Sequence, residues 1–364
     1  MNFITNFFND ITNFFKSGSV LGVDIGTNSI KVVELSGGKG SFKLENYGII
    51  RAKDYLIHSN KAIQNSSLSI VEDEASRLLK ILLKEMKTKG KVALVSIPTF
   101  TSFVTLIDMP ALSEKETTQS IGFQAKQYIP MPLNQVSVDW TKIDEYVNKE
   151  NQKMQKILLV GIPQTVINSF KKVCKNAGLN LTALELDAMA MTRAFVGTDK
   201  PLMVVDIGAG STLTTVMEGG VVKYVGQTDY SGVHITKAVS KSLDLSMLRA
   251  EELKIRRGLG GEKEESELSS LILPFLDVII QEIEYTKGLY ENRYGKKVEN
   301  LSLTGGGAKL KGIEKYFSSR MNMTLSSPST FVSINHNTGL EPAIPGLEKE
   351  LPIAVGLAKR YFIS

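Results

Sequence analysis

The stretch that decides the fold is Val20–Leu35, which reads VLGVDIGTNSIKVVEL. Two short apolar runs flank a turn that contains Gly26, Thr27, Asn28 and Ser29. Runs rich in β-branched residues on both sides of a Gly- and Asn-containing turn are typical of a β-hairpin. The sequence therefore predicts two antiparallel strands with a tight polar turn between them.

The residues of this turn suit an anionic ligand. Gly26 lets the backbone approach a ligand closely, and Thr27 and Ser29 offer hydroxyl groups. Successive backbone N–H groups in such a turn form a concave anion site. Asp24, at the end of the first strand, would repel a phosphate unless a divalent cation lay between them. The segment indicates a Mg-nucleotide turn, although an ordinary hairpin with a polar tip explains it equally well when it is taken alone.

The same pattern occurs a second time, at Met203–Met217, which reads MVVDIGAGSTLTTVM. The aligned pairs are Asp24 with Asp206, Gly26 with Gly208, Asn28 with Gly210, and Ser29 with Ser211. Two copies about half a chain apart predict two similar lobes, each with one anion-binding turn. Two such turns that face each other can hold one polyphosphate between them.

Bulk composition describes a globular protein with room for two domains. The chain has 364 residues, of which 42% are apolar and 22% charged, and its formal net charge is +5. No Lys- and Arg-rich block with interleaved aromatic residues occurs, so nucleic acid is not an expected partner. Cys174 is the only cysteine, which excludes internal disulfides. No apolar run reaches the roughly 20 residues of a membrane span, and the start lacks a signal-peptide pattern, so we expect a cytoplasmic protein.

Residues 1–18 predict an amphipathic N-terminal helix. Its apolar residues recur at helical spacing: Phe3, Ile4, Phe7, Phe8, Ile11, Phe14 and Phe15. Burial of each such side chain is worth ~1.5–3 kcal/mol, so we expect this face to be covered. Either the helix docks on protein, or residues 3–15 provide a peripheral attachment to a membrane.

The segment 19–98 predicts the core of a first lobe. After the hairpin, Phe42–Ile50 reads as a third strand, Ile70–Met86 as a helix and Val92–Ile97 as a buried strand. The order strand, strand, strand, helix, strand is typical of a ribonuclease-H-like α/β unit. Together with the repeat, it predicts an α/β fold of two such lobes.

Residues 99–180 interrupt this pattern and predict an inserted α+β module. A capping-box pattern opens a helix at Ser113. Val136–Trp140 and Ile157–Ile162 read as two strands, with the charged stretch Asp144–Lys156 as the loop between them. The module has no cluster of acid, base and nucleophile, and we interpret it as an interaction module.

Three further candidates lie between and within the lobes. Asp187, at a strand–helix junction, is either a helix N-cap or a carboxylate that orients a water molecule. Glu251 and Lys254, one helical turn apart, form either an exposed ion pair or a pair that brackets a ribose. Gly305, Gly306 and Gly307, between a strand and a helix, favour contact with a nucleoside or α-phosphate.

The predicted division of the chain has five parts. The N-terminal helix covers 1–18; the first lobe combines 19–98, 181–200 and 351–364; the inserted module covers 99–180; the second lobe combines 201–235 and 300–350; and 236–299 form a helical subdomain of that lobe.

Three motifs in sequence order resemble those of a known superfamily. Asp-Ile-Gly-Thr, Asp-Ile-Gly-Ala-Gly-Ser and Thr-Gly-Gly-Gly resemble the phosphate-1, phosphate-2 and adenosine motifs of the actin/Hsp70/sugar-kinase superfamily. Within it, Met109–Trp140 is similar to the inserted module of the PilM family of type IV pilus assembly proteins, which shares its position with the module of the FtsA cell-division proteins. The resemblance implies an actin-like fold of duplicated ribonuclease-H-like lobes.

The resemblance also implies ATP and Mg²⁺ between the lobes. Asp24 and Asp206 would hold the metal through water, Lys31 would lie near the phosphates, and Asp187 would be the catalytic acid that orients water. The remaining nucleotide-binding residues would be Gly26, Thr27, Asn28, Ser29, Gly208, Gly210, Ser211, Glu251, Lys254, Gly305, Gly306 and Gly307. ATP binding is expected, with weak ATPase activity as an open possibility.

The implied partners are the N-terminal cytoplasmic peptide of the inner-membrane protein PilN and other pilus platform proteins. The peptide groove would lie between the first lobe and the inserted module, and the protein would be recruited to the inner face of the cytoplasmic membrane. Two alternatives stay open: an FtsA-like, membrane-associated protein that forms filaments, and a small-molecule kinase. A kinase would need a base in the cleft and a polar substrate pocket, and the sequence of the module shows no pattern that indicates either.

Overall fold

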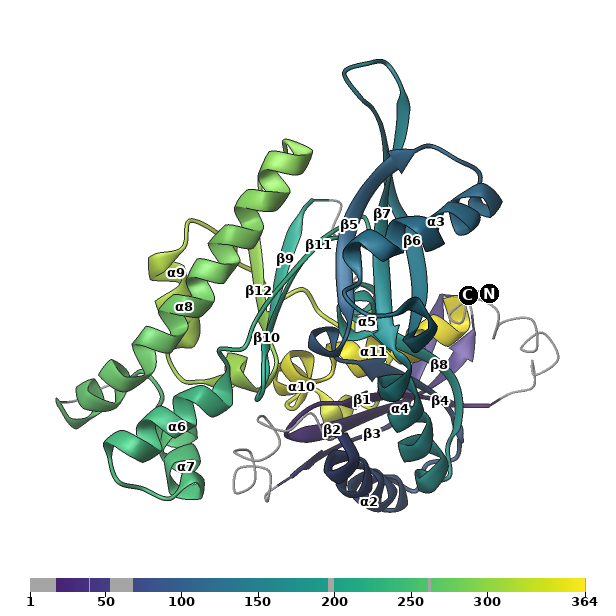
Figure 1. Ribbon diagram of the computed structural model, residues 1–364. Coiled ribbons are helices and arrows are strands. Elements are labelled where there is room, and N and C mark those ends of the chain that lie inside the picture. Colours follow the sequence, from purple (N-terminus) through teal and green to yellow (C-terminus); the bar gives the residue numbers. More distant parts are fainter. Residues whose placement is uncertain (1–17, 39, 53–67, 196–199, 261–262, 364) are drawn as a thin grey trace.

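The computed structural model describes residues 18–38, 40–52, 68–195, 200–260 and 263–363. The predicted N-terminal helix falls outside these residues, and its role stays a prediction. The described helices and strands form two lobes with an additional module beside them (Figure 1). None of the helices in these ranges is long and apolar enough to span a bilayer.

The first lobe is built on a six-stranded sheet of order β14-β3-β2-β1-β4-β8. Its strands are β1 (Val20–Ile25), β2 (Ser29–Gly38), β3 (Ser41–Arg51), β4 (Val92–Ile97), β8 (Asn180–Leu186) and β14 (Ile334–Asn335). β1, β2 and β3 are antiparallel neighbours, whereas β4 and β8 run parallel to β1. The predicted hairpin and the strand order that follows it are confirmed.

The second lobe repeats this scheme in a five-stranded sheet of order β11-β10-β9-β12-β13. Its strands are β9 (Leu202–Ile207), β10 (Thr212–Glu218), β11 (Val221–Thr228), β12 (Asn300–Thr304) and β13 (Thr324–Leu325). Again three antiparallel strands are followed by two parallel ones. The two lobes therefore share one topology, as the sequence repeat predicts.

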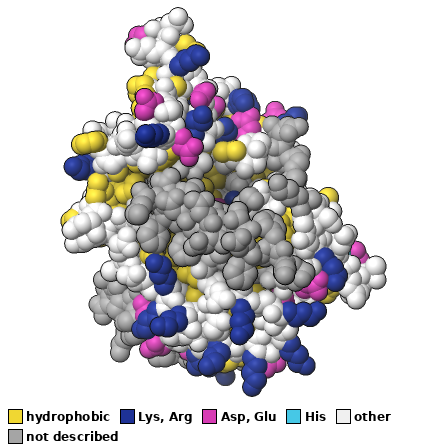
Figure 2. Space-filling view, turned by 90° about the vertical axis from the view of Figure 1, so that its right-hand side faces the viewer, with side chains coloured by type: hydrophobic (Ala, Val, Ile, Leu, Met, Phe, Trp, Pro, Cys, Tyr) yellow, Lys and Arg dark blue, Asp and Glu magenta, His cyan; other side chains and the backbone are white. Residues whose placement is uncertain are grey.

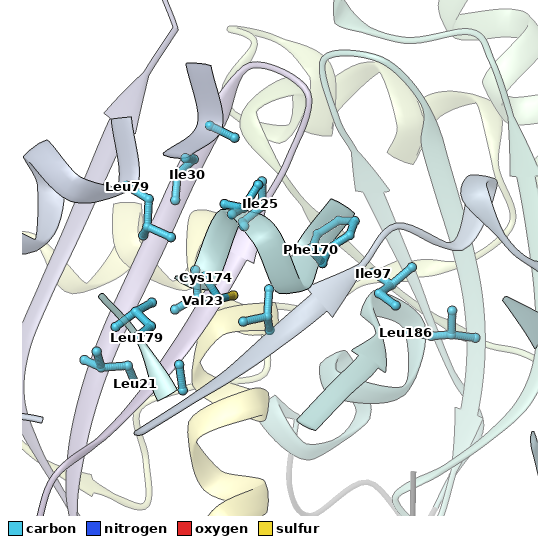
Figure 3. Packing of buried hydrophobic residues seen from close by; sticks show 14 of the residues in the cluster. Leu21, Val23, Ile25, Ile30, Leu79, Ile97, Phe170, Cys174, Leu179 and Leu186 are labelled. Carbon is cyan, nitrogen blue, oxygen red and sulfur yellow. The ribbon is translucent and has the colours of Figure 1, made fainter. Parts of the chain in front are cut away.

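Helices cover both faces of the first sheet. α2 (Leu68–Met86) and α4 (Gln164–Ala177) lie on one face, and their apolar sides meet those of β1 and β4 (Figure 3). α5 (Asp187–Ala194) and α11 (Pro352–Ile363) lie on the other face, between the lobes. Gly356 allows the close contact of these two helices, because a methyl group there would collide with Ala190 O. The sheet is thus buried on both sides, which explains its continuous apolar strands.

Four helices of the second lobe lie on its side away from the first lobe (Figure 1): α6 (Gly232–Ser242), α7 (Met247–Arg257), α8 (Lys263–Tyr294) and α9 (Ile313–Arg320). A fifth helix, α10 (Ile344–Glu350), lies beside α11 between the lobes. Short 3-10 turns occur at η5 (Gly306–Lys309) and η6 (Thr338–Leu340). The chain breaks between α6 and α7, where Asp244 has a φ of 50°.

The inserted module is a three-stranded antiparallel sheet of order β5-β7-β6 with one helix packed on it. Its elements are η3 (Thr99–Thr101), β5 (Phe103–Pro110), α3 (Glu114–Tyr128), η4 (Leu133–Gln135), β6 (Val136–Val147) and β7 (Lys153–Pro163). The capping box of Ser113 and Glu116 is confirmed. The charged loop expected over 144–156 is wrong: both strands continue into a ribbon that stands away from the rest, so polar side chains are solvated there.

One strand crosses the predicted division. β14 pairs with β3, so residues 334–335, which the sequence assigned to the second lobe, add a strand to the first sheet.

On the face of the molecule turned 90° from Figure 1, hydrophobic side chains are exposed at mid-height, between the module and the first lobe (Figure 2). Lys and Arg side chains are concentrated over the lower part of that face (Figure 2).

Candidate functional site

A cavity of about 560 Å³ lies between the two hairpin turns. Every site residue predicted from the sequence lines it: Asp24, Gly26, Thr27, Asn28, Ser29, Lys31, Asp187, Asp206, Gly208, Gly210, Ser211, Glu251, Lys254, Gly305, Gly306 and Gly307. These residues come from both lobes and from the helical part of the second lobe. The roles assigned to them individually stay predictions.

The two turns have the same backbone geometry. Gly26 N donates to Ser29 O at 3.0 Å, and Gly208 N donates to Ser211 O at 3.0 Å. The repeat in the sequence therefore produces the same tight turn twice. Asn28 Oδ1 in the first turn is buried and lacks a hydrogen-bond partner among the described residues, so it is available to a bound group.

Asp24 is held by two neighbours in the first lobe. Lys31 lies opposite it in the β1–β2 register and donates from Nζ to Asp24 Oδ2 at 3.1 Å. Ser96, on β4, donates from Oγ to Asp24 Oδ1 at 2.8 Å. Burial lowers the pKa of Lys31, but the carboxylates of Asp24 and Asp206 outweigh this effect and hold it above its ordinary value. Lys31 is thus a fixed positive charge between two acids.

Asp206 occupies the equivalent place in the second lobe. Burial raises its pKa; the Lys31 ammonium offsets this only in part, and Asp24 adds to it. Gly305 has a φ of 85°, and a methyl group on it would collide with Asp206 Oδ1. Glycine is therefore required where the third motif passes the second acid. The carboxylate of Asp206 lies in a low-dielectric site in which a bound cation would stabilise its charged form.

Glu251 and Lys254 do not form an exposed ion pair. Lys254 is buried and lies 2.6 Å from Glu251 Oε2, and its Nζ also donates to Gly232 O and to Thr236 Oγ1, at 3.0 and 2.8 Å. Gly232 N in turn donates to Gly208 O at 3.0 Å. Burial lowers the pKa of Lys254, whereas Glu251 opposes the shift. The pair is therefore tied to the second turn and to the wall of the cavity.

Asp187 is the first residue of α5 and not its N-cap, which is Leu186. Its carboxylate accepts hydrogen bonds from Ala188 N at 2.7 Å, Thr99 N at 3.2 Å and Thr99 Oγ1. Burial raises the pKa of Asp187 to about 7, because its loss of solvent outweighs these hydrogen bonds. A carboxylate with such a pKa can exchange a proton near neutrality.

Sequence reasoning missed a charged cluster in the lining of the cavity. Glu350 accepts from Lys309 Nζ at 2.5 Å and from Arg51 at 2.6 Å, and all three residues line the cavity. Burial raises the pKa of Glu350, but the two cations outweigh it and keep the pKa below its usual range. Arg51 and Glu350 are 299 positions apart, so no local pattern links them.

A family model described as type IV pilus assembly protein PilM matches residues 22–362. The chain belongs to the PilM family. Among curated proteins, the cell division protein FtsA of Enterococcus hirae is 26% identical over 268 residues. That match covers 67% of this chain and 58% of the FtsA, so the chain corresponds to little more than half of that relative's length.

Two solved structures support the fold of this PilM-family chain. A PilM-PilN type IV pilus biogenesis complex superposes with a TM-score of 0.80 at 21% identity, covering 94% of this chain and 98% of the other. MreB 5 of Spiroplasma citri bound to AMPPNP superposes with a TM-score of 0.50 at 14% identity, covering 94% and 95%. The actin-like fold of duplicated lobes with an inserted module is confirmed. No group of three or more potential metal ligands occurs within the described ranges.

Proposed function

We propose that the chain is an ATP-binding scaffold of the type IV pilus machinery, in which Mg-ATP occupies the cavity between the lobes. The observation that carries this proposal is the pair of turns with matching backbone hydrogen bonds that face one cavity, each with an acid beside it. Polyphosphates bind where backbone N–H groups converge. The solved MreB with its bound nucleotide analogue has the same fold and adds support.

The residues of the cavity fit Mg²⁺ as well as phosphate. Mg²⁺ keeps several waters and is usually bound by one or two carboxylates together with phosphates. Both oxygens of Asp24 already accept hydrogen bonds, from Lys31 and Ser96, so Asp24 would hold the metal through water. Asp206 would gain a cation that offsets its burial. The bound metal would neutralise phosphate charge, and Lys31 would do the same from the protein side.

Slow hydrolysis is compatible with the position of Asp187. Phosphoryl transfer to water depends mainly on positioning and charge neutralisation. Asp187 lines the same cavity, and its pKa of about 7 suits a group that orients and deprotonates an attacking water. Thr99 fixes the carboxylate through two hydrogen bonds, so the orientation would be set before the nucleotide arrives.

The partner of the scaffold is proposed to be the N-terminal cytoplasmic peptide of PilN. A groove of about 310 Å³ lies between the inserted module and the first lobe, lined by residues of β6, β7, α4 and β8. β6 and β8 are each the edge strand of their sheet, and edge strands accept extended peptides through main-chain hydrogen bonds. The solved PilM-PilN complex, which resembles the chain in fold, supports this partner. Attachment to PilN would hold the protein at the cytoplasmic face of the membrane.

Contacts between the module and the second lobe would make peptide binding depend on the nucleotide. Arg293 of α8 forms an ion pair with Asp108 of β5. Lys223 of β11 donates from Nζ to Ile143 O at 2.7 Å and lies 3.8 Å from Asp144. A second lobe that moves when ATP binds would therefore pull on one wall of the peptide groove.

The melting temperature of the full chain with and without Mg-ATP tests the nucleotide proposal. At free ligand 100 times Kd the stabilisation should be ~2.7 kcal/mol. Asp24→Asn and Asp206→Asn should remove the shift, whereas Asp244→Asn, on an exposed turn of the same chain where Asn tolerates positive φ, should retain it. A shift that persists in both cavity variants would place the nucleotide elsewhere and refute the proposal.

A further inference from the structure

The walls of the peptide groove differ in charge. One wall is β6, which contributes Ser137 and Asp139, and the opposite wall includes α4, which contributes Lys171 and Lys175. The rest of the lining is largely apolar: Ile162, Ile167, Leu179, Leu181, Ala183 and Leu184. An extended peptide would thus meet one acid in a mainly apolar channel, with bases across from it.

The alternation of β6 explains why Asp139 faces the groove. Val138 and Trp140 pack against the module's own core of Ile107, Ile121 and their neighbours. Residues that alternate along a strand point to opposite faces. Ser137 and Asp139 therefore lie on the face that meets α4 and β8, and both line the groove.

Asp139 is a buried carboxylate, and few neighbouring groups stabilise its negative charge. Only 8% of the residue is exposed, and its Oδ1 accepts a hydrogen bond from Trp140 N at 2.9 Å. Burial raises the pKa of Asp139, and the backbone hydrogen bond and the more distant charge of Arg360 offset this only in part. Arg360 already forms an ion pair with Glu185, at 3.3 Å, and this carboxylate partly neutralises its positive charge. A buried carboxylate in this state gains from a cation brought by a ligand.

We propose that Asp139 is the specificity-determining residue of the groove, and that it binds a cation of the peptide, either a Lys or Arg side chain or a free N-terminal ammonium. This inference rests on the proposed binding of PilN in this groove. Lys171 and Lys175 reinforce the selection because they disfavour a cation on the α4 side, which leaves the β6 side as its place. The ligand is thus an extended peptide with apolar residues and one cation directed at β6.

The test is a titration of the full chain with the synthetic N-terminal PilN peptide from the same organism. The peptide is used in its native form, with its N-terminus acetylated, and with each Lys or Arg replaced in turn by norleucine. Asp139→Asn, which keeps shape and removes charge, should weaken binding of the native peptide about tenfold or more. Glu145→Gln, an exposed carboxylate further along β6, is the matched control and should leave affinity unchanged.

A double-mutant comparison identifies the cation. One peptide change should weaken binding to the wild-type protein as much as Asp139→Asn does, and should cause no further loss in that variant. Equal affinity of Asp139→Asn and wild type, or losses that simply add for every peptide, would overturn the inference.

Ser137→Trp separates this inference from the proposed groove, because its bulky side chain fills the groove between β6 and α4. If this variant, folded by its melting temperature, still binds the peptide as wild type does, the groove itself is wrong and the inference falls with it. If Ser137→Trp blocks binding and Asp139→Asn does not weaken it, the groove stands and the role of Asp139 is refuted.

Discussion

Thr27 and Gly210 meet across the cleft: a methyl group added to Gly210 would lie 2.8 Å from Thr27 Cγ2 and 2.9 Å from Thr27 Oγ1. These residues belong to the first and second hairpin turns, so the two turns are in direct contact. The distance between the lobes at this point is set by the absence of a side chain at Gly210. The residue that aligns with it in the repeat is Asn28, so the two turns are alike in backbone and different in bulk.

Gly210→Ala should push the turns apart and weaken Mg-ATP binding about tenfold, because contacts below 3.0 Å must be relieved by movement of one turn. Thr27→Ala removes both atoms that the new methyl group would strike. The double variant should therefore bind ATP no more weakly than Thr27→Ala alone. Isothermal titration of the three variants with Mg-ATP checks this. If the losses of affinity in the two single variants simply add in the double variant, contact between the turns does not determine ATP binding.

Arg293→Met should reduce the coupling between the two ligands while each still binds. The change breaks the ion pair with Asp108 that links the second lobe to the module, so movement of the lobe reaches the groove less directly. The measurement is the ratio of peptide Kd values without and with Mg-ATP, which should approach one. Arg320→Met, which breaks an ion pair with Asp277 inside the second lobe, is the control and should keep the wild-type ratio.

Lys359→Met should stabilise the protein at pH 7 by about 2–3 kcal/mol. Lys359 is 1% exposed, its Nζ is 3.4 Å from Thr330 O, and burial lowers its pKa to about 8 from 10.5. Below pH 8 the folded protein carries the full cost of this buried charge. Between about pH 8 and 10.5 the Lys359 side chain binds more protons in the unfolded chain than in the folded protein. The free energy of unfolding therefore rises with pH over this range. The free energy of unfolding, measured with denaturant across this pH range, should show this rise in wild type, and the rise should be absent in Lys359→Met.

Gly356→Ala should destabilise the protein by about 3 kcal/mol or more, because the new methyl group would collide with backbone atoms of Ala190 in α5. Gly288, in the middle of α8, has open space around it. Gly288→Ala is the matched substitution and should be neutral or stabilise by up to about 1 kcal/mol, since alanine is the better helix former. Thermal unfolding of the pair checks this, and a similar loss in both would show that packing between α5 and α11 is not the cause.

Local and repeated patterns made much of the fold predictable. The Asp-Ile-Gly turns are encoded within a few residues by β-branched runs, a glycine and small polar residues, and their repetition told us that the lobes are alike. The capping box of Ser113 and Glu116 is equally local. Most of the predicted site residues lie at the end of a strand or in the turn that follows it, which explains why they meet at one cavity, whereas Glu251 and Lys254 reach it from within α7.

Relations between distant residues were not predictable. The cluster of Arg51, Lys309 and Glu350 depends on how the last third of the chain returns to the first sheet. The addition of Ile334–Asn335 to β3 involves two residues in a loop-rich segment that has no strand pattern. The break between α6 and α7 was not predictable for a different reason: apolar spacing continues through it, while the backbone turns at Asp244, a single residue with positive φ.

The position of α11 has a consequence for synthesis on the ribosome. This helix covers β1, the first described strand, and β14 completes the edge of the same sheet. A nascent chain therefore exposes the apolar surface of its earliest strands until residue 363 has emerged. The sheet whose strands are synthesised first is therefore covered only when the last described helix has been made.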